Sequence, residues 1–216
     1  MGLLIVSGLV IVSLAERFGS DFPSSVEALF NLDKEQTIAT WFSSMLLGLN
    51  GLLALALRST EHEMRLVKYW TTLGWLLIIL SLDEAASLHE RTGLLLANLR
   101  LEGAFQYAWV IPGTVLVLLA GVWFLGFFRQ LQPRLRNVLM TAGFLYVAGA
   151  LGVEFLEGAV ASGALFGVVG ETGTPYNSVV AIQEFMEMAA LVILMTALLR
   201  ELGTRTEQLG FTFDLL

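Results

Sequence analysis

The stretch that decides the fold runs from Tyr69 to Arg91 and reads YWTTLGWLLIIL followed directly by SLDEAASLHER. Its first part is almost entirely apolar, which is typical of a helix that crosses a lipid bilayer. Its second part carries Asp83, Glu84, His89 and Glu90 with no spacer between them and the apolar part. Ionisable groups inside a membrane span are costly, so these side chains are candidates for a function as well as for a structural role.

The composition places the whole chain in a membrane. Hydrophobic residues make up 56% of the 216 residues and charged residues 14%, and the mean hydropathy is +0.75, whereas soluble domains carry about 25% charged residues. There is no cysteine, which excludes disulfides, thiolate metal sites and cysteine nucleophiles. The net charge of −7 is unusual for a protein that binds nucleic acid or anionic lipid, so neither is an expected partner.

Hydropathy predicts an all-α fold, a single transmembrane helical bundle over residues 1–216 with about six spans. A spanning helix needs about 20 apolar residues. The expected spans are residues 2–15, 38–57, 69–88, 108–128, 138–157 and 179–199. The first is short, so it is either a partial span or the remainder of a longer segment that begins upstream.

Basic residues in the connections predict the orientation, because Lys and Arg are enriched in cytoplasmic loops. The connections after the second and fourth spans and the C-terminal tail carry Arg58, Arg65, Lys68, Arg129, Arg134, Arg136, Arg200 and Arg205. The other side carries Arg17, Lys34, Arg91 and Arg100. We therefore expect a multi-pass protein of the bacterial cytoplasmic (inner) membrane with both termini in the cytoplasm.

Alternating spans bring the intramembrane acids to one depth. The third and fifth spans run outward and end in acids, and the sixth runs inward and begins with acids. These spans deliver Asp83, Glu84, His89, Glu90, Glu154, Glu157, Glu184 and Glu187 to a band very roughly 0–10 Å below the outer edge of the hydrocarbon. This set is the predicted metal site.

The spacing of the acids adds detail to this prediction. Glu154 and Glu157, like Glu184 and Glu187, are three residues apart and share a helix face. On the third span, Glu84 and His89 project to either side of the face that carries Asp83. These groups cannot all point to one centre unless the helix loosens near its end. Ser44, Gln106 and Tyr107 are candidates to line the same cavity, and Asn50 is a candidate interhelical hydrogen bonder.

Energetics require a counter-charge for the cluster. An acid at mid-membrane costs about 2.5–3.5 kcal/mol on insertion scales, and clustered carboxylates repel one another. Protons, bound cations or a folded-back Arg100 are the available partners. Structural roles stand beside the metal site: Glu90 and Glu157 as helix-end acids, Glu184 as a first-turn acid, and the others as a hydrogen-bonded network.

Five segments together resemble a family of uncharacterised multi-pass bacterial membrane proteins. They are FNLDKEQTIATWFSS (30–44), SLDEAASLHE (81–90), WVIPG (109–113), GVEFLEG (152–158) and QEFMEM (183–188). The resemblance spans roughly residues 30–200, and the LDEAASLHE-type motif is its most specific part. It implies a bacterial origin and a membrane topology, and it implies no activity.

Several membrane classes are excluded by the residues that they require. A retinal protein needs an intramembrane Lys, but Lys34 and Lys68 lie in connections. A bis-histidine haem and a ceramidase-like zinc site need more than the one intramembrane His, and the Gly-x-Ser-Gly of rhomboid-type proteases is missing.

Three functions remain open. The first is a divalent metal site for Mn, Fe, Ca or Zn, which suits carboxylates with one imidazole; if it is catalytic, redox chemistry on a lipid-soluble substrate is expected. It departs from the carboxylate di-metal bundles because there is no Glu-x-x-His. The second is a non-catalytic subunit of a larger membrane complex, whose partners are other membrane subunits. The third is proton or cation transport, although the acids occupy only one half of the membrane.

Overall fold

The computed structural model describes residues 1–34, 36–96, 103–165, 167 and 170–208. In these residues the chain forms helices and no strand, which confirms the all-α prediction. The elements are α1 (Gly2–Phe18), η1 (Gly19–Asp21), α2 (Ser24–Phe30), α3 (Ile38–Ser59), α4 (Met64–Ala86), α5 (Leu88–Leu96), η3 (Gly103–Phe105), α6 (Val110–Gln130), α7 (Pro133–Val147), the π-helical segment η4 (Ala148–Val153), α8 (Glu154–Ala161) and α9 (Thr174–Gln208).

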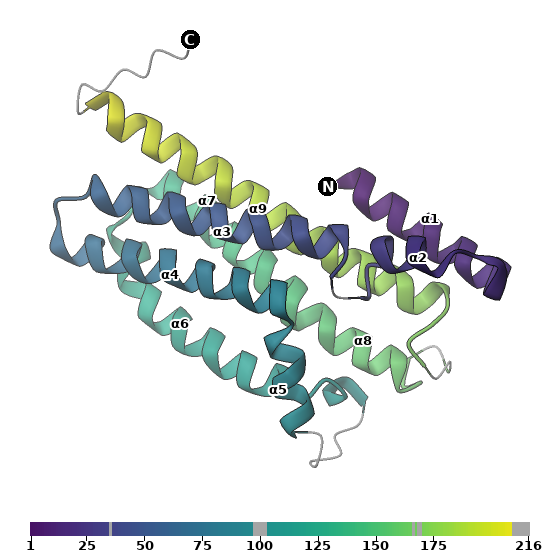
Figure 1. Ribbon diagram of the computed structural model, residues 1–216. Helices are drawn as coiled ribbons and strands as arrows, with labels where there is room; N and C mark the ends of the chain where they lie inside the picture. The colour runs from purple at the N-terminus through teal and green to yellow at the C-terminus, as the bar shows by residue number, and fades with distance from the viewer. Residues whose placement is uncertain (35, 97–102, 166, 168–169, 209–216) are drawn as a thin grey trace, which may run out of the picture.

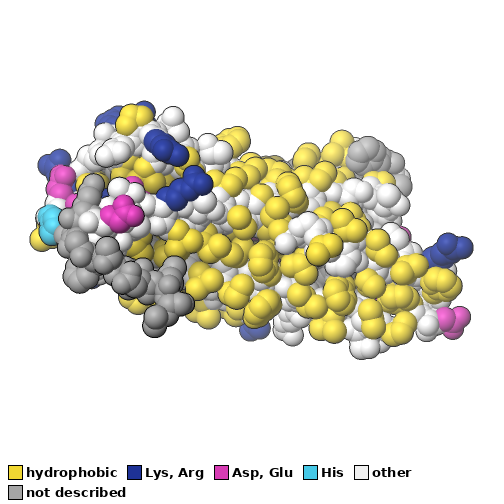
Figure 2. Space-filling view, turned by 90° about the horizontal axis from the view of Figure 1, so that it is seen from above, with side chains coloured by type: hydrophobic (Ala, Val, Ile, Leu, Met, Phe, Trp, Pro, Cys, Tyr) yellow, Lys and Arg dark blue, Asp and Glu magenta, His cyan; other side chains and the backbone are white. Residues whose placement is uncertain are grey.

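Six segments of the described chain are long and apolar enough to cross a membrane, which confirms the predicted number of spans. They are Gly2–Asp21, Ile38–Ser59, Met64–Ala86, Val110–Gln130, Pro133–Ala161 and Thr174–Glu207. Figure 2 shows a wide hydrophobic stretch on one face of the molecule, with charged side chains gathered mainly toward its two ends. Such a surface is suited to contact with lipid.

The spans alternate in direction, so the bundle has two distinct ends (Figure 1). We call one the acidic end; the segments 19–37, 87–109 and 162–173 connect the spans there. We call the other the basic end; it holds the connections 60–63 and 131–132 and the C-terminal part of α9. Helix α1 lies only along the half of the bundle near the acidic end, where it packs against α9 and α2.

Helices α3 and α4 form the closest pair in the bundle, because glycine lets their backbones approach. A Cβ added at Gly51 would lie 2.8 Å from the Gly74 carbonyl oxygen, and one added at Gly74 would lie 3.0 Å from that of Gly51. Small residues allow such contact between membrane helices. Asn50, fully buried, donates through Nδ2 to the Leu191 carbonyl oxygen at 3.1 Å and ties α3 to α9. This bond confirms the interhelical role predicted for Asn50.

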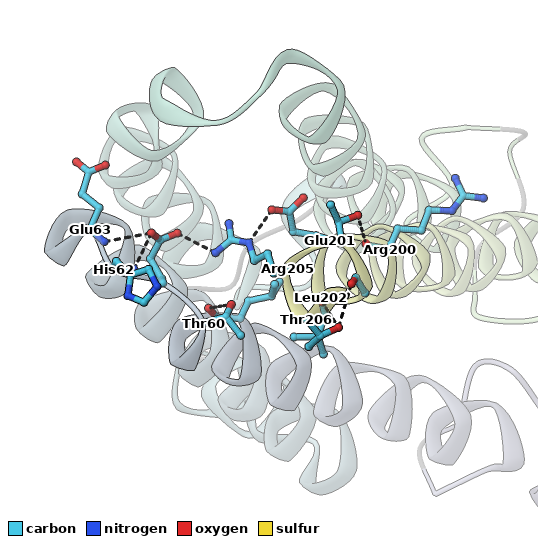
Figure 3. Close-up of polar contacts among 12 residues, drawn as sticks. Thr60, His62, Glu63, Arg200, Glu201, Leu202, Arg205 and Thr206 are labelled. Carbon is cyan, nitrogen blue, oxygen red and sulfur yellow. Dashed lines mark hydrogen bonds and ion pairs between the residues drawn. The ribbon is translucent and has the colours of Figure 1, made fainter. Parts of the chain in front are cut away.

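A charged network fixes α9 to the α3–α4 connection at the basic end (Figure 3). Arg205 donates from Nη1 to Glu61 at 2.8 Å and from Nε to Glu201 at 2.7 Å. The Glu61 carboxylate also accepts the backbone N–H groups of His62 and Glu63. These donors lower the pKa of Glu61 although its partial burial opposes them. The guanidinium lies 5.7 Å from the ring centroid of the fully buried Trp70.

Candidate functional site

A break between α4 and α5 brings the first two predicted site residues together. Ser87 adopts a left-handed conformation (φ 51°, ψ 45°), which is uncommon for a residue other than glycine. In a continuous helix, residues six positions apart lie about 9 Å apart along the axis and point to different faces. Across the break, His89 Nδ1 lies 3.0 Å from Asp83 Oδ2. The helix therefore loosens near its end, which was the stated condition for its ionisable groups to point to one centre.

Trp109, which precedes α6, connects this pair to α8. Its ring centroid lies 4.8 Å from that of His89, and its Nε1 donates to Glu154 Oε1 at 3.1 Å. The N–H of Trp109 therefore has a partly buried carboxylate as its partner, and tryptophan N–H groups usually find such a partner when they are withdrawn from water.

The π-helical segment η4 sets the direction of Glu154. It occupies residues 148–153 and ends where α8 begins, at Glu154. A π-helical turn inserts an extra residue and rotates all that follows, and such turns often occur at functional sites. Gly149 lies inside it, and a Cβ there would come within 3.0 Å of Glu187 Cγ on α9. From α9, Gln183 Nε2 donates to Glu154 Oε2 at 3.3 Å.

Two carboxylates in this region are buried. Glu157 is 5% exposed and Glu187 is 8% exposed. Glu187 lies within electrostatic reach of Glu84, Glu154, Glu157 and Glu184, so α4, α8 and α9 contribute to one acidic group. We call these five residues the acidic cluster.

Two buried oxygen atoms in this region have no hydrogen-bond partner among the described residues. They are Glu157 Oε1 and Gln183 Oε1. Both belong to side chains that interact with Glu154, one electrostatically and one through a hydrogen bond. Both atoms are acceptors, and a buried acceptor without a partner is costly. Glu157 Oε1 therefore calls for a proton, a water molecule or a cation, and Gln183 Oε1 calls for a water molecule or a cation.

A second hydrogen-bonded network lies at the acidic end, and most of its members were not predicted from the sequence. Tyr176 on α9 donates to Asp33 Oδ1 at 2.6 Å, and the hydroxyls of Tyr176 and Tyr107 lie 3.1 Å apart. Tyr107 also donates to Glu171 at 2.9 Å. Burial raises the pKa of Tyr107. Burial also raises the pKa of Asp33 to about 6, although the hydrogen bond from Tyr176 lowers that pKa in part.

Asp33 is within electrostatic reach of Glu90 and Glu157, so this second network adjoins the acidic cluster. Asp33 falls within the resembling segment FNLDKEQTIATWFSS, which was the available signal. Glu171 and Tyr176 follow no pattern that a single sequence reveals.

The three residues that were predicted to line the cavity of the acids lie in different surroundings. Tyr107 joins the network of Asp33, and Gln106 donates to the same Glu171 carboxylate at 3.4 Å. Ser44 instead donates to the Ser81 carbonyl oxygen at 2.9 Å, across the α3–α4 pair. Its hydroxyl therefore serves helix packing. Arg100, one of the predicted counter-charges, lies outside the described residues.

The eight predicted metal ligands are brought to one region of the bundle in different ways. They are Asp83, Glu84, His89, Glu90, Glu154, Glu157, Glu184 and Glu187. Asp83 and His89 are in direct contact, and the acidic cluster is linked to them through Trp109. Glu90 follows the break and is exposed. Over the described ranges, no three His, Asp or Glu side chains stand close enough together to hold a metal ion as they are placed.

Comparison with known proteins gives a family and no activity. No curated protein and no solved structure matches the chain. The model of a Domain of unknown function (DUF8692) matches residues 2–202, which is nearly the whole length of the chain and covers the first five spans and most of the sixth. The all-helical membrane bundle with its acidic end therefore belongs to the DUF8692 family.

Proposed function

We propose that the acidic cluster binds a divalent cation. The observation that carries the proposal is the Oε1 atom of Glu157, which is buried and has no hydrogen-bond partner among the described residues. It lies beside Glu154 and within electrostatic reach of Glu184. An unpaired charge in such a place costs several kcal/mol, and a cation shared among the carboxylates removes that cost.

The donor atoms suit hard or borderline cations. Glu157 and Glu187 would be the central ligands because they are the most buried acids of the group. Glu154, Glu184 and the amide oxygen of Gln183 would supply further oxygens after small side-chain rotations. Oxygen donors favour Ca or Mn, and His89 with Asp83 at the margin also allows Fe or Zn. A bound Mn or Fe ion would supply redox chemistry.

Proton uptake is the second candidate, and two observations favour it. Both oxygens of Glu154 already accept hydrogen bonds, from Trp109 and Gln183. In addition, the described side chains form no ready-made group of three metal ligands. Protons on Glu157 and Glu187 would remove the charge of the two most buried acids of the cluster without any metal. The protein would then be a carrier or sensor of protons in one half of the membrane.

Elemental analysis of the detergent-purified protein, combined with Glu157→Gln, separates the two candidates. With a bound cation, the wild type should contain close to one metal per chain, and Glu157→Gln should lower both the metal content and the melting temperature, because a ligand stabilises the folded state that binds it. Asp21→Asn is the control, because Asp21 is an exposed acid at the same end. Less than about 0.2 metal per chain, with stability indifferent to chelators, would reject the cation.

The same variant has the opposite outcome if protons neutralise the cluster. Glutamine resembles a protonated glutamic acid in shape and charge. Glu157→Gln should then leave the melting temperature unchanged or raise it, and added Mn, Fe, Zn or Ca should have no effect.

We also infer that the basic end faces the cytoplasm of a bacterial inner membrane. Eight of the twelve Lys and Arg residues lie in or next to the connections at that end, and four do not. The chain has no cysteine, so single cysteines can report the orientation. Thr172→Cys should react with an impermeant thiol reagent in intact cells, whereas His62→Cys and Gln132→Cys should react only after permeabilisation. The reverse pattern would invert the topology.

A further inference from the structure

A large groove lies at the basic end, between the start of α4 and the end of α6, away from the acidic cluster. It encloses about 590 Å³. Its lining includes Arg65, Lys68, Tyr69, Trp123 and Arg129. Three of these side chains are cationic and two are aromatic, so the groove joins a charged rim to an apolar wall.

The aromatic wall is held in place by close packing. The ring centroids of Tyr69 and Trp123 lie 5.7 Å apart at an interplanar angle of 63°, and Tyr69 lies 5.4 Å from Phe127. Gly126 makes this possible, because a Cβ at that position would overlap the Tyr69 hydroxyl. The aromatic wall of the groove is therefore positioned by ring packing between α4 and α6.

The cations of the rim have no ion-pair partner among the described residues. Arg65, Lys68 and Arg129 are exposed, and none of them forms an ion pair with another described residue. One acid, Glu63, also lines the groove, which leaves a surplus of two positive charges from three cations and one carboxylate. Arg205 at the same end differs, because its guanidinium is bound by Glu61 and Glu201.

We propose that this groove binds the phosphate group of an anionic phospholipid. Basic pockets between spans bind such headgroups, and tyrosine and tryptophan are suited to the boundary between water and hydrocarbon. A lipid fits better than a free phosphate because the apolar wall continues along α6 into exposed Leu119 and Val122, which are 62% and 69% exposed and can receive an acyl chain. The net charge of −7 of the whole chain argued against binding of anionic lipids, but the basic end carries a local surplus of positive charge.

Native mass spectrometry of the purified chain with added phosphatidylglycerol or phosphatidylcholine tests the proposal. The wild type should bind phosphatidylglycerol more tightly. The triple variant Arg65→Gln, Lys68→Gln, Arg129→Gln should lose about 100-fold in affinity, because each cation near an anionic surface contributes about fivefold. The matched control is Arg58→Gln, Arg134→Gln, Arg136→Gln, which removes three cations from the same end outside the groove and should lose far less. Equal losses in the two triple variants, or no preference between the lipids, would overturn the proposal.

Two further measurements distinguish the source of the phosphate and guard against misfolding. Inorganic phosphate should fail to displace phosphatidylglycerol at millimolar concentration, and displacement by it would reject the lipid as occupant. Lys68→Glu changes one exposed side chain, so the fold should persist. This variant should weaken phosphatidylglycerol binding while the melting temperature stays constant, and unchanged binding would overturn the assignment.

Discussion

Replacing Trp109 by phenylalanine should reveal whether Glu154 is charged. The change deletes the N–H that donates to Glu154 Oε1 at 3.1 Å and keeps an aromatic ring beside His89. A hydrogen bond to an ionised group contributes about 1.5–3 kcal/mol, whereas one between neutral groups contributes about 0.5–1.5 kcal/mol. Glu154 is partly buried and lies near other carboxylates, so an ionised Glu154 would require a cation nearby.

The assay is the free energy of unfolding in mixed detergent micelles, measured as a double-mutant cycle with Glu154→Gln. If Glu154 is ionised, Trp109→Phe should cost about 1.5–3 kcal/mol in the wild type and about 0.5–1.5 kcal/mol in the Glu154→Gln background. Equal costs in both backgrounds would mean that Glu154 is neutral, which favours protons over a metal.

The control is Trp75→Phe, which makes the same change of side chain at a site that is 55% exposed on α4. It should cost little, because no described residue accepts a hydrogen bond from Trp75. If Trp109→Phe costs no more than this control, the hydrogen bond to Glu154 does not contribute to stability and the reasoning is refuted.

Three further predictions concern the fold and its pH dependence. Gly51→Ala should destabilise the protein by about 1–3 kcal/mol, because the new methyl group would lie 2.8 Å from the Gly74 carbonyl oxygen; Gly121→Ala, with nothing within 4 Å, should be neutral or stabilising in the same unfolding assay. Asp33 has a pKa raised to about 6 from 3.8, so its contribution to stability is fully present below about pH 4 and is lost as the pH rises through about 6. Melting curves of Asp33→Asn should lack that loss, and an unchanged profile would contradict the raised pKa of Asp33. Arg205→Gln should destabilise by about 3–5 kcal/mol if its two carboxylate partners remain charged, and a melting temperature equal to that of Arg200→Gln would disprove this role.

The sequence alone determined the membrane architecture. Five apolar stretches of about 20 residues and a shorter one at the N-terminus leave few alternatives to six helices, because unpaired backbone groups are not tolerated in hydrocarbon. Because consecutive spans alternate in direction, the sequence also predicts that the acids lie at one end of the bundle, whatever the packing of the helices. The sequence-based boundaries were less accurate. The last span begins at Thr174 and not near 179, and helix α2 was not expected, because hydropathy reports membrane depth and not helix ends.

Tertiary structure alone decided which side chains meet. Periodicity fixes the face of a residue on its own helix, but the rotation of each helix about its axis depends on its neighbours. The left-handed Ser87 turned His89 back to Asp83, and the π-helical turn before Glu154 reset the direction of α8. Trp109 and Gln183 became partners of Glu154 only through contacts between distant segments. The groove at the basic end arose in the same way, because Gly126 and Tyr69 are far apart in the chain and meet only when α4 packs beside α6.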